Sequence, residues 1–307
     1  MWLARRFAEK VRDAPANSPS TLDSSIQHLS EEQTWRQQHR AFDIRFDAPA
    51  SAPAQAAKSR ALTLHANAAA ALAAGQAQGP ALVFCAVTAA ADLDAARSCA
   101  DALVAGSLYA DCNSASPSVK QQAAELIDAG AGAYVEVAVM SPIFPKRSTA
   151  PMLLGGPHAE QFAERVQALG FSGCVVHSAV VGPASATKMC RSVFVKGMEA
   201  LISESMLSAR YYGVEDGVLD SLSNLFPSDD WRRFARYMIS RTIEHGGRRA
   251  EEMREVVKTV EHAGVQPWMS AACVQRQQWA PQHQSALEHE DLGPFLDAIR
   301  ANMESER

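Results

Sequence analysis

Short apolar runs typical of β-strands alternate with helix-like segments in the first half of the chain. The clearest run is ALVFCAVT (81–88), which is continuous and rich in β-forming residues, as expected of a strand buried on both faces. Similar runs lie at 106–114 and 133–140, and helical patterns at 90–104 and 117–130 separate the three. This alternation predicts a parallel sheet built from crossover units, which is the α/β class.

Two segments precede this pattern. AFDIRFDA (41–48) is typical of a short strand, and residues 60–75 are typical of a brief strand followed by a helix. Residues 1–40 contain neither a strand-like run nor a glycine. We expect them to form an atypical N-terminal segment that is helical or disordered.

The strand pattern ends near Gly182. Residues 185–213 are expected to form one long helix, which Pro183 or Ser185 can start and Gly213 can end. About 28 helical residues span about 42 Å, which is typical of a helix that joins domains or lines an oligomer interface. Further helices are expected at 214–225, 229–245, 247–264 and 291–305.

The composition argues against several classes of protein. A net charge of -5 gives no electrostatic reason to expect nucleic acid or an anionic membrane as a partner. No apolar run approaches the roughly 18 residues of a membrane helix, and the start MWLARRFAEKVRD has no apolar signal core. The six cysteines form no CxxC pair and no metal-ligand spacing, so we expect reduced thiols, no metal and a cytoplasmic location.

Lys188 is the first candidate functional residue. It lies one turn into the long helix, directly after VGPASA, and Ser192 lies one turn further on the same face. Partial burial lowers the pKa of a lysine and suits it to proton transfer with a substrate hydroxyl or carbonyl. The alternative is an ordinary solvated helix lysine.

The loop DCNSASP (111–117) follows a predicted strand at its carboxyl end, where open α/β sheets bind ligands. Asn113, Ser114 and Ser116 offer donors and acceptors for a carboxylate or a hydroxyl. The alternative is a turn before a helix that is capped by Ser116, with Pro117 as its first residue. The two interpretations are compatible.

Two more segments offer ligand-binding groups. AVMSPIFP (138–145) also follows a predicted strand, and its backbone amides near Ser141 can bind an anion; otherwise it is an ordinary loop. Asp47 ends the 41–48 strand, where an acidic residue of a dinucleotide fold accepts the ribose hydroxyls, whereas Arg45 favours a phosphorylated ribose. The alternative for Asp47 is an exposed charge at a strand end.

HGGRRAEEMREV (245–256) places basic residues at the predicted start of a helix: His245, Arg248 and Arg249. They can bind an acidic substrate, or they can pair with glutamates at helical spacing in the same segment: Glu251, Glu252 and Glu255. We favour the ion pairs, because arginine near a helix N-terminus is electrostatically unfavourable without a partner.

Five of these segments, in this order, resemble 6-phosphogluconate dehydrogenase-like members of the β-hydroxyacid dehydrogenase superfamily, and in particular a bacterial subgroup with a helical C-terminal domain described as NAD-binding. The segments are DCNSASPSVK, YVEVAVMSPIFP, PMLLGGPHAE, GPASATKMCRSVFVKGMEAL and HGGRRAEEMREV. The resemblance covers roughly residues 41–275. It implies a Rossmann-like α/β domain at 41–182, joined by the long helix to an all-α domain at 183–307 that binds substrate and forms a homodimer.

The resemblance also implies a reaction, the NAD- or NADP-linked oxidation or reduction of a small hydroxy acid. Lys188 falls at the position of the family's catalytic lysine, and Asn113 and Ser114 fall in its substrate-carboxylate loop. Val87 and Thr88 end the strand that borders the nicotinamide ribose in the family.

This chain departs from the family pattern at three places. Ser192 stands where many members have asparagine, and Met140-Ser141-Pro142 stand where many have a Ser-Gly-Gly turn. The family begins with a strand and a GxGxxG-type turn, which residues 1–40 lack, so the α/β domain is expected to be incomplete and its cofactor binding impaired. Either the recorded start is mis-called or frame-shifted, which we favour, or the chain has diverged.

Three functions follow from the sequence. The first is a dehydrogenase of small hydroxy acids with Lys188 as the acid and base. The second is a non-catalytic binding or assembly homologue that has lost the cofactor loop. The third is another nicotinamide chemistry on the same scaffold, such as imine reduction.

Overall fold

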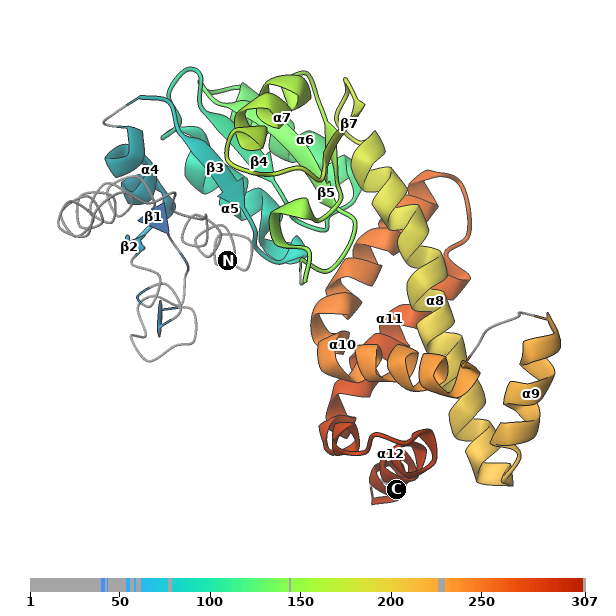
Figure 1. Ribbon diagram of the computed structural model, residues 1–307. Coiled ribbons are helices and arrows are strands. Elements are labelled where there is room, and N and C mark those ends of the chain that lie inside the picture. Colours follow the sequence, from blue (N-terminus) through green and yellow to red (C-terminus); the bar gives the residue numbers. More distant parts are fainter. Residues whose placement is uncertain are drawn as a thin grey trace, which may run out of the picture. The chain divides into compact units, whose positions relative to one another are not determined.

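The computed structural model of the chain (Figure 1) describes residues 40–41, 43, 54–55, 58, 62–76, 79–143, 145–225 and 230–305. The predictions for residues 1–39 and for most of the 41–48 strand, including Asp47 and Arg45, lie outside the described residues. The chain divides into two compact units, residues 1–188 and residues 189–307.

The first unit contains a five-stranded sheet with the strands in the order β3-β4-β5-β6-β7. Every neighbouring pair is parallel except β5 and β6, which are antiparallel. The strands are β3 (Leu82–Cys85), β4 (Leu108–Asp111), β5 (Ala133–Val139), β6 (Met152–Gly155) and β7 (Cys174–Ser178). This mainly parallel sheet confirms the α/β class.

Helices cover both faces of the sheet. Successive residues of β4 therefore pack alternately in two cores, one on each face. Leu108 and Ala110 pack in one core with Phe162 of the helix α7, whereas Tyr109 packs in the other core with Ile127 of the helix α6. The helices that the structure describes in full in this unit are α4 (Ala68–Gln76), η1 (Ala89–Ala91), α5 (Asp92–Ala100), α6 (Pro117–Asp128), η2 (Arg147–Thr149) and α7 (Ala159–Gln167).

The strand β3 lies at one edge of the described sheet, with β4 as its strand neighbour there. A dinucleotide fold of strand order 3-2-1-4-5-6 would place its first strand beside this edge. Two short segments earlier in the chain, β1 (Arg40–Ala41) and β2 (Thr63–Leu64), pair in a separate two-stranded parallel sheet. Among the described residues, no strand pairs with β3 on its other side.

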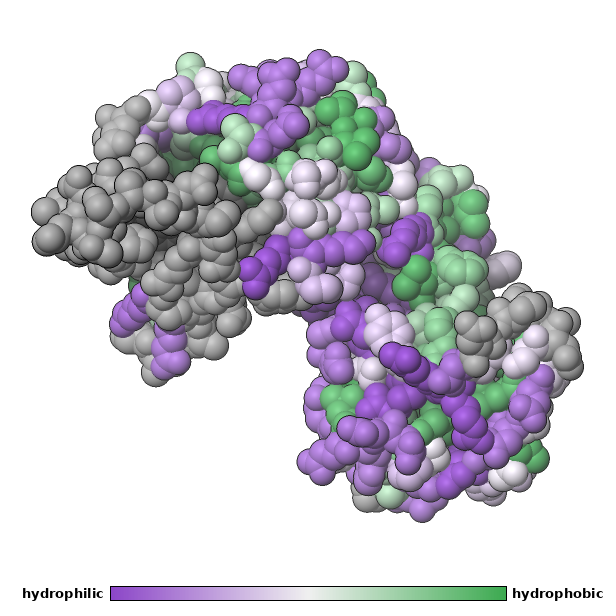
Figure 2. Space-filling view, in the orientation of Figure 1, coloured by the Kyte–Doolittle hydropathy of each residue, from purple (hydrophilic) through white to green (hydrophobic). Residues whose placement is uncertain are grey.

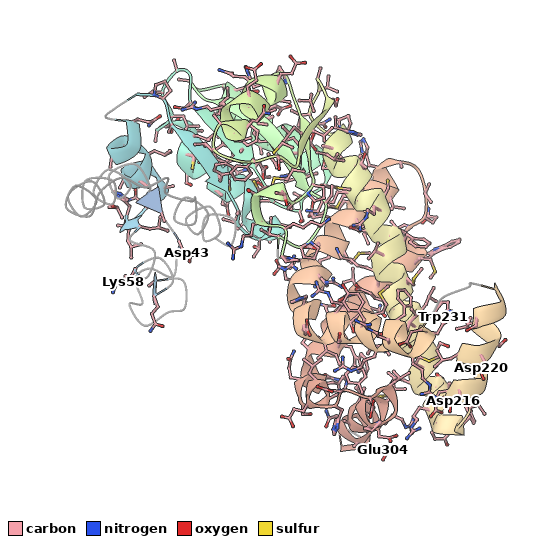
Figure 3. All side chains as sticks on the ribbon, viewed as in Figure 1. Asp43, Lys58, Asp216, Asp220, Trp231 and Glu304 are labelled. Carbon is pink, nitrogen blue, oxygen red and sulfur yellow. The ribbon has the colours of Figure 1, made fainter. Side chains whose placement is uncertain are left out.

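The second unit is all-α over its described residues, as predicted. The long helix α8 (Pro183–Tyr212) enters it from the first unit. Asp216 and Trp231, labelled in Figure 3, belong to two of its helices, which an ion pair between Asp216 and Arg232 connects. The remaining helices are α9 (Glu215–Leu225), α10 (Trp231–His262), α11 (Trp268–Trp279), η3 (Ala280–Glu288) and α12 (Leu292–Ser305).

The predicted division of 229–245 and 247–264 into two helices is wrong. One continuous helix, α10, runs through both segments, including the glycine pair. A β-carbon on Gly246 would overlap the carbonyl oxygen of Gln277 in α11. The glycine therefore serves close packing between α10 and α11, and Arg248 and Arg249 lie in the middle of a helix instead of at its start.

Candidate active site

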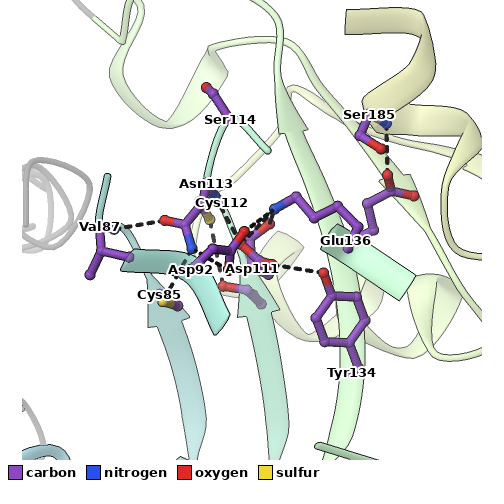
Figure 4. Close-up of polar contacts among 12 residues, drawn as sticks. Cys85, Val87, Asp92, Asp111, Cys112, Asn113, Ser114, Tyr134, Glu136 and Ser185 are labelled. Atoms are coloured by element: carbon purple, nitrogen blue, oxygen red, sulfur yellow. Dashed lines mark hydrogen bonds and ion pairs between the residues drawn. The ribbon is translucent and has the colours of Figure 1, made fainter. Parts of the chain in front are cut away.

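The long helix α8 begins on a buried carboxylate. Glu136 of β5 is fully buried, and its carboxylate accepts a hydrogen bond of 2.8 Å from the backbone N–H of Gly182. It also accepts one of 2.7 Å from the backbone N–H of Ser185 (Figure 4). The first N–H groups of a helix have no partner within the helix, and a negative charge there is favourable. Glu136 therefore fixes the first turn of the helix that bears Lys188.

The glycine pair of the PMLLGGPHAE segment makes room for this contact. A β-carbon on Gly155, the last residue of β6, would overlap Oε2 of Glu136. Gly156 follows with a φ of +102°, a conformation that side chains disfavour. We expect both positions to require glycine for a structural reason.

Lys188 contacts the loop after β4. Its Nζ donates a hydrogen bond of 2.7 Å to Oγ of Ser114, and both side chains are partly buried. The two residues are 74 positions apart in the sequence. The structure thus brings together two of the residues predicted from separate segments, at the carboxyl end of a parallel strand.

Asn113 is buried beside this pair, with 3% of its surface exposed. Its Oδ1 accepts a hydrogen bond of 2.7 Å from the backbone N–H of Val87, and its Nδ2 donates one of 2.9 Å to Oδ1 of Asp92. Its Nδ2 also lies 3.4 Å from Sγ of Cys85. The Asn113 amide therefore ties the end of β4 to the end of β3 and to the start of α5.

A buried ionic cluster lies under this loop, and the sequence did not indicate it. Nζ of Lys120 in α6 lies 2.5 Å from Oδ1 of Asp111 and 3.8 Å from Oδ2 of Asp92, and all three side chains are at most 1% exposed. The Tyr134 hydroxyl donates a hydrogen bond of 2.7 Å to Oδ2 of Asp111. Figure 4 shows Asp92, Asp111 and Tyr134 of this cluster together with Asn113.

Burial and the neighbouring charges together set the protonation of the cluster. Burial raises the pKa of the Asp92 carboxyl to about 7; the charge of Asp111 adds to this rise and the charge of Lys120 opposes it. Burial acts to lower the pKa of Lys120, but the charges of Asp111 and Asp92 outweigh it and the pKa is raised. Burial also raises the pKa of the Cys85 thiol to about 12, which keeps it protonated at neutral pH.

The remaining predicted site residues are more scattered. Val87 and Thr88 are exposed just beyond the carboxyl end of β3. Ser141 follows β5, and its hydroxyl donates a hydrogen bond of 3.0 Å to the carbonyl oxygen of Pro142. Ser192 is buried on α8, four residues after Lys188.

The basic residues of 245–256 form ion pairs inside the second unit. Arg248 pairs with Glu252 as predicted, whereas Arg249 is buried against Glu199 of α8 instead of a glutamate of its own segment. Burial, followed by the charges of Arg241, Arg249 and Arg248, lowers the pKa of His245. Among the described residues, no group of His, Cys, Asp and Glu side chains is arranged to hold a metal ion.

Comparisons with known proteins place the chain in a family. A family profile described as a domain of unknown function (DUF1932) matches residues 209–280. A conserved hypothetical protein from Sinorhizobium meliloti, of known structure, is 32% identical to the chain, with 93% of this chain and 94% of that protein covered and a TM-score of 0.65. The chain belongs to the same family as this protein.

More distant structures of this kind show that the family has the fold of hydroxyacid dehydrogenases. The conserved protein MTH1747, described as structurally similar to 3-hydroxyacid dehydrogenases, is 24% identical, with coverage of 91% of this chain and 95% of that one and a TM-score of 0.60. The 3-hydroxyisobutyrate dehydrogenase of Mycobacterium tuberculosis is 15% identical, with coverage of 89% and 94% and a TM-score of 0.59. The resemblance inferred from the sequence is therefore confirmed at the level of the fold.

A similarity to a further protein covers less of the chain. An uncharacterised 28.5 kDa protein of Methanothermus fervidus is 27% identical over 171 residues. The chain spans 61% of the length of that relative.

Proposed function

We propose that the chain is an NAD- or NADP-dependent oxidoreductase of the 3-hydroxyacid and 6-phosphogluconate dehydrogenase type that acts on a small hydroxy acid. The observation that carries this proposal is the 2.7 Å hydrogen bond from Lys188 to Ser114. It places an amine and a hydroxyl at the carboxyl end of β4, where ligands bind in open α/β sheets.

Lys188 is the acid and base of the proposed reaction. In oxidation its neutral amine accepts the proton of the substrate hydroxyl, and in reduction its ammonium returns that proton to the carbonyl oxygen. A bound nicotinamide supplies the hydride acceptor or donor. Ser114 orients the amine, and Glu136 holds the helix turn from which the lysine extends.

Asn113 has a positioning role in this proposal, because its amide is engaged by Val87, Asp92 and Cys85. Ser114 is the residue of the loop that meets the substrate. Ser141 and Ser192 are candidates for further substrate contacts, since each lies close in sequence to the groups described above: Ser141 directly after β5 and Ser192 one turn after Lys188.

The described residues fit one end of a dinucleotide. Val87 and Thr88 are exposed at the carboxyl end of β3, as residues bordering a nicotinamide ribose must be. Among these residues the glycine pair between a strand and a helix is Gly155–Gly156, and Gly155 is packed against Glu136. With no glycine in residues 1–40 either, we expect the chain to bind the pyrophosphate weakly.

Cofactor titration combined with a turnover assay tests this function. We expect NADH and NADPH to bind more weakly than micromolar, and we expect slow turnover of a small 2- or 3-hydroxy acid when either cofactor is present in large excess. Micromolar affinity would refute the proposed impairment. Saturation with cofactor and no turnover of any hydroxy acid would favour the non-catalytic homologue, which the missing glycines also suit.

We also infer a homodimer formed through the helical unit. Apolar side chains are exposed on α8 at Phe194 (68%), Leu201 (58%) and Tyr212 (74%), and on α11 at Trp268 (77%) and Met269 (54%). Figure 2 shows hydrophobic residues gathering along α8 on the face in view. Patches of this kind mark interaction surfaces in proteins that fold in water.

Leu201→Glu is expected to convert the dimer to monomer, because the interface would have to bury an unpaired charge. Light scattering after size-exclusion chromatography measures the mass of each species. Ser221→Glu adds the same charge to an exposed position on α9 and is expected to leave the dimer intact. A wild-type monomer, or a Leu201→Glu dimer as stable as the wild type, would contradict the inference.

We infer a reducing, cytoplasmic location for the protein from its thiols. All six cysteines are unpaired, and four of them are buried: Cys85, Cys99, Cys112 and Cys273. Separately, no described helix is both long and apolar enough to cross a membrane.

A further inference from the structure

The loop that presents Ser114 to Lys188 is fixed from below by charged groups that no solvent reaches. We propose that the buried cluster of Asp92, Asp111 and Lys120 is a positioning device for this loop: it holds Asn113, and Asn113 holds the backbone on which Ser114 sits. The proposal rests on the function proposed for Lys188 and Ser114, and it adds three positioning residues to that site.

Each step of the connection is a direct contact. Asp92 accepts a hydrogen bond from the Asn113 side chain at 2.9 Å, and Asp111 accepts one from the Asn113 backbone N–H at 3.0 Å. Lys120 holds the two carboxylates and also donates to the backbone carbonyl oxygen of Asp111 at 3.2 Å. Asn113 is therefore held by hydrogen bonds at both its side chain and its backbone, one residue before Ser114.

The composition of the cluster supports a role in geometry more than in stability. Burying two carboxylates and one ammonium costs solvation free energy, and apolar side chains of the same volume are often equally stable or more so. An apolar residue at position 92 would leave Nδ2 of Asn113 without its carboxylate acceptor. Charged groups at these positions are thus explained by the hydrogen bonds that they direct at Asn113.

The strength of the hydrogen bond from Asn113 to Asp92 also depends on the protonation of Asp92. The groups that face Asp92 are Lys120 from α6, Asp111 and Asn113 from the β4 end, and Cys85 from β3, while Tyr134 and Glu136 of β5 act on Asp111 and Lys120. Burial raises the pKa of Asp92 to about 7. Above that pH an ionised Asp92 accepts the stronger, charge-assisted hydrogen bond from Asn113.

Hydrogen exchange with mass spectrometry tests this positioning role without a turnover assay. In Asp92→Ala we expect the amides of Val87 and of residues 112–116 to exchange on the order of tenfold faster than in the wild type. Trace acetylation should label Lys188 several-fold faster, because Ser114 no longer holds its amine. Asp94→Ala is the matched control, since Asp94 lies on the same helix with its side chain 83% exposed and should change neither readout.

The conservative variant separates positioning from folding. Asp92→Asn keeps an oxygen that can accept from Asn113, so at pH 6 its exchange pattern should match that of the wild type. In the wild type, protection of residues 112–116 should increase as the pH rises through about 7, and in Asp92→Asn it should stay constant. A folded Asp92→Ala with unchanged exchange and labelling would overturn the proposal, and a wild-type protection that ignores pH would overturn its dependence on the protonation of Asp92. If these readouts behave as expected while Lys188 proves dispensable for turnover, only the proposed function fails.

Discussion

Replacing Lys188 by methionine is expected to lower the turnover of a hydroxy acid substrate by about 10²–10⁴-fold, the usual contribution of general acid–base catalysis. Methionine retains the length of the side chain but neither donates nor accepts the proton. The backbone of α8 should be unaffected, because Glu136 binds it at Gly182 and Ser185, ahead of the substituted residue. The loss should therefore appear in kcat more than in KM.

Single-turnover measurements with cofactor in large excess provide the comparison, since they remove any difference in cofactor binding. Lys258→Met is the control, because Lys258 is an exposed residue of α10 whose ammonium pairs with Glu255. Ser114→Ala keeps the amine and should reduce kcat less than Lys188→Met does. A Lys188→Met protein with wild-type turnover would remove the lysine from the proposed mechanism.

The sheet could be predicted from the sequence where its strands are continuous apolar runs. All four residues of β4 are buried, so the run carries a strong signal. The strand β6 has only four residues and ends at Gly155, the first of two glycines. The strand β7 follows the short helix α7 and carries exposed valines, so neither sequence resembles that of a buried strand. The glycine pair at 246–247 led to the wrong prediction of a helix break, because glycine occurs both at breaks and where two helices pack closely.

The candidate site could be predicted only in part, for a physical reason. Lys188 and Ser114 stand next to recognisable landmarks, a helix start and a strand end. The acidic groups beneath them become neighbours only through the register of the sheet, which pairs Asp111 with Cys85 on one side and with Glu136 on the other. The available signal was an acidic residue at a buried strand position, together with Lys120 on the apolar face of α6.

Asp92→Asn is expected to make the protein more stable relative to the wild type as the pH rises. The pKa of Asp92 is about 7 in the folded protein and near its ordinary value of 3.8 in the unfolded chain. Between these values the folded state binds the extra proton, so the free energy of unfolding of the wild type falls as the pH rises through this window. A rise of about three in pKa corresponds to on the order of 4 kcal/mol, and asparagine removes this loss because it does not ionise.

Urea unfolding at pH 4.5, 6 and 8 measures the free energy of unfolding of the two proteins. The difference between them should grow up to about pH 7 and stay constant above it. The direction is the informative part, because a simple count of ion pairs predicts the opposite: it would have Asp92→Asn lose a stabilising contact with Lys120 at neutral pH. Asp94→Asn should show no such slope, since its side chain is 83% exposed on the same helix. A difference that shrinks with rising pH would mean that the ion pair with Lys120 outweighs burial and that Asp92 is ionised throughout. The cluster would then hold Asn113 equally well at every pH near neutrality, and its pH dependence would have to be abandoned.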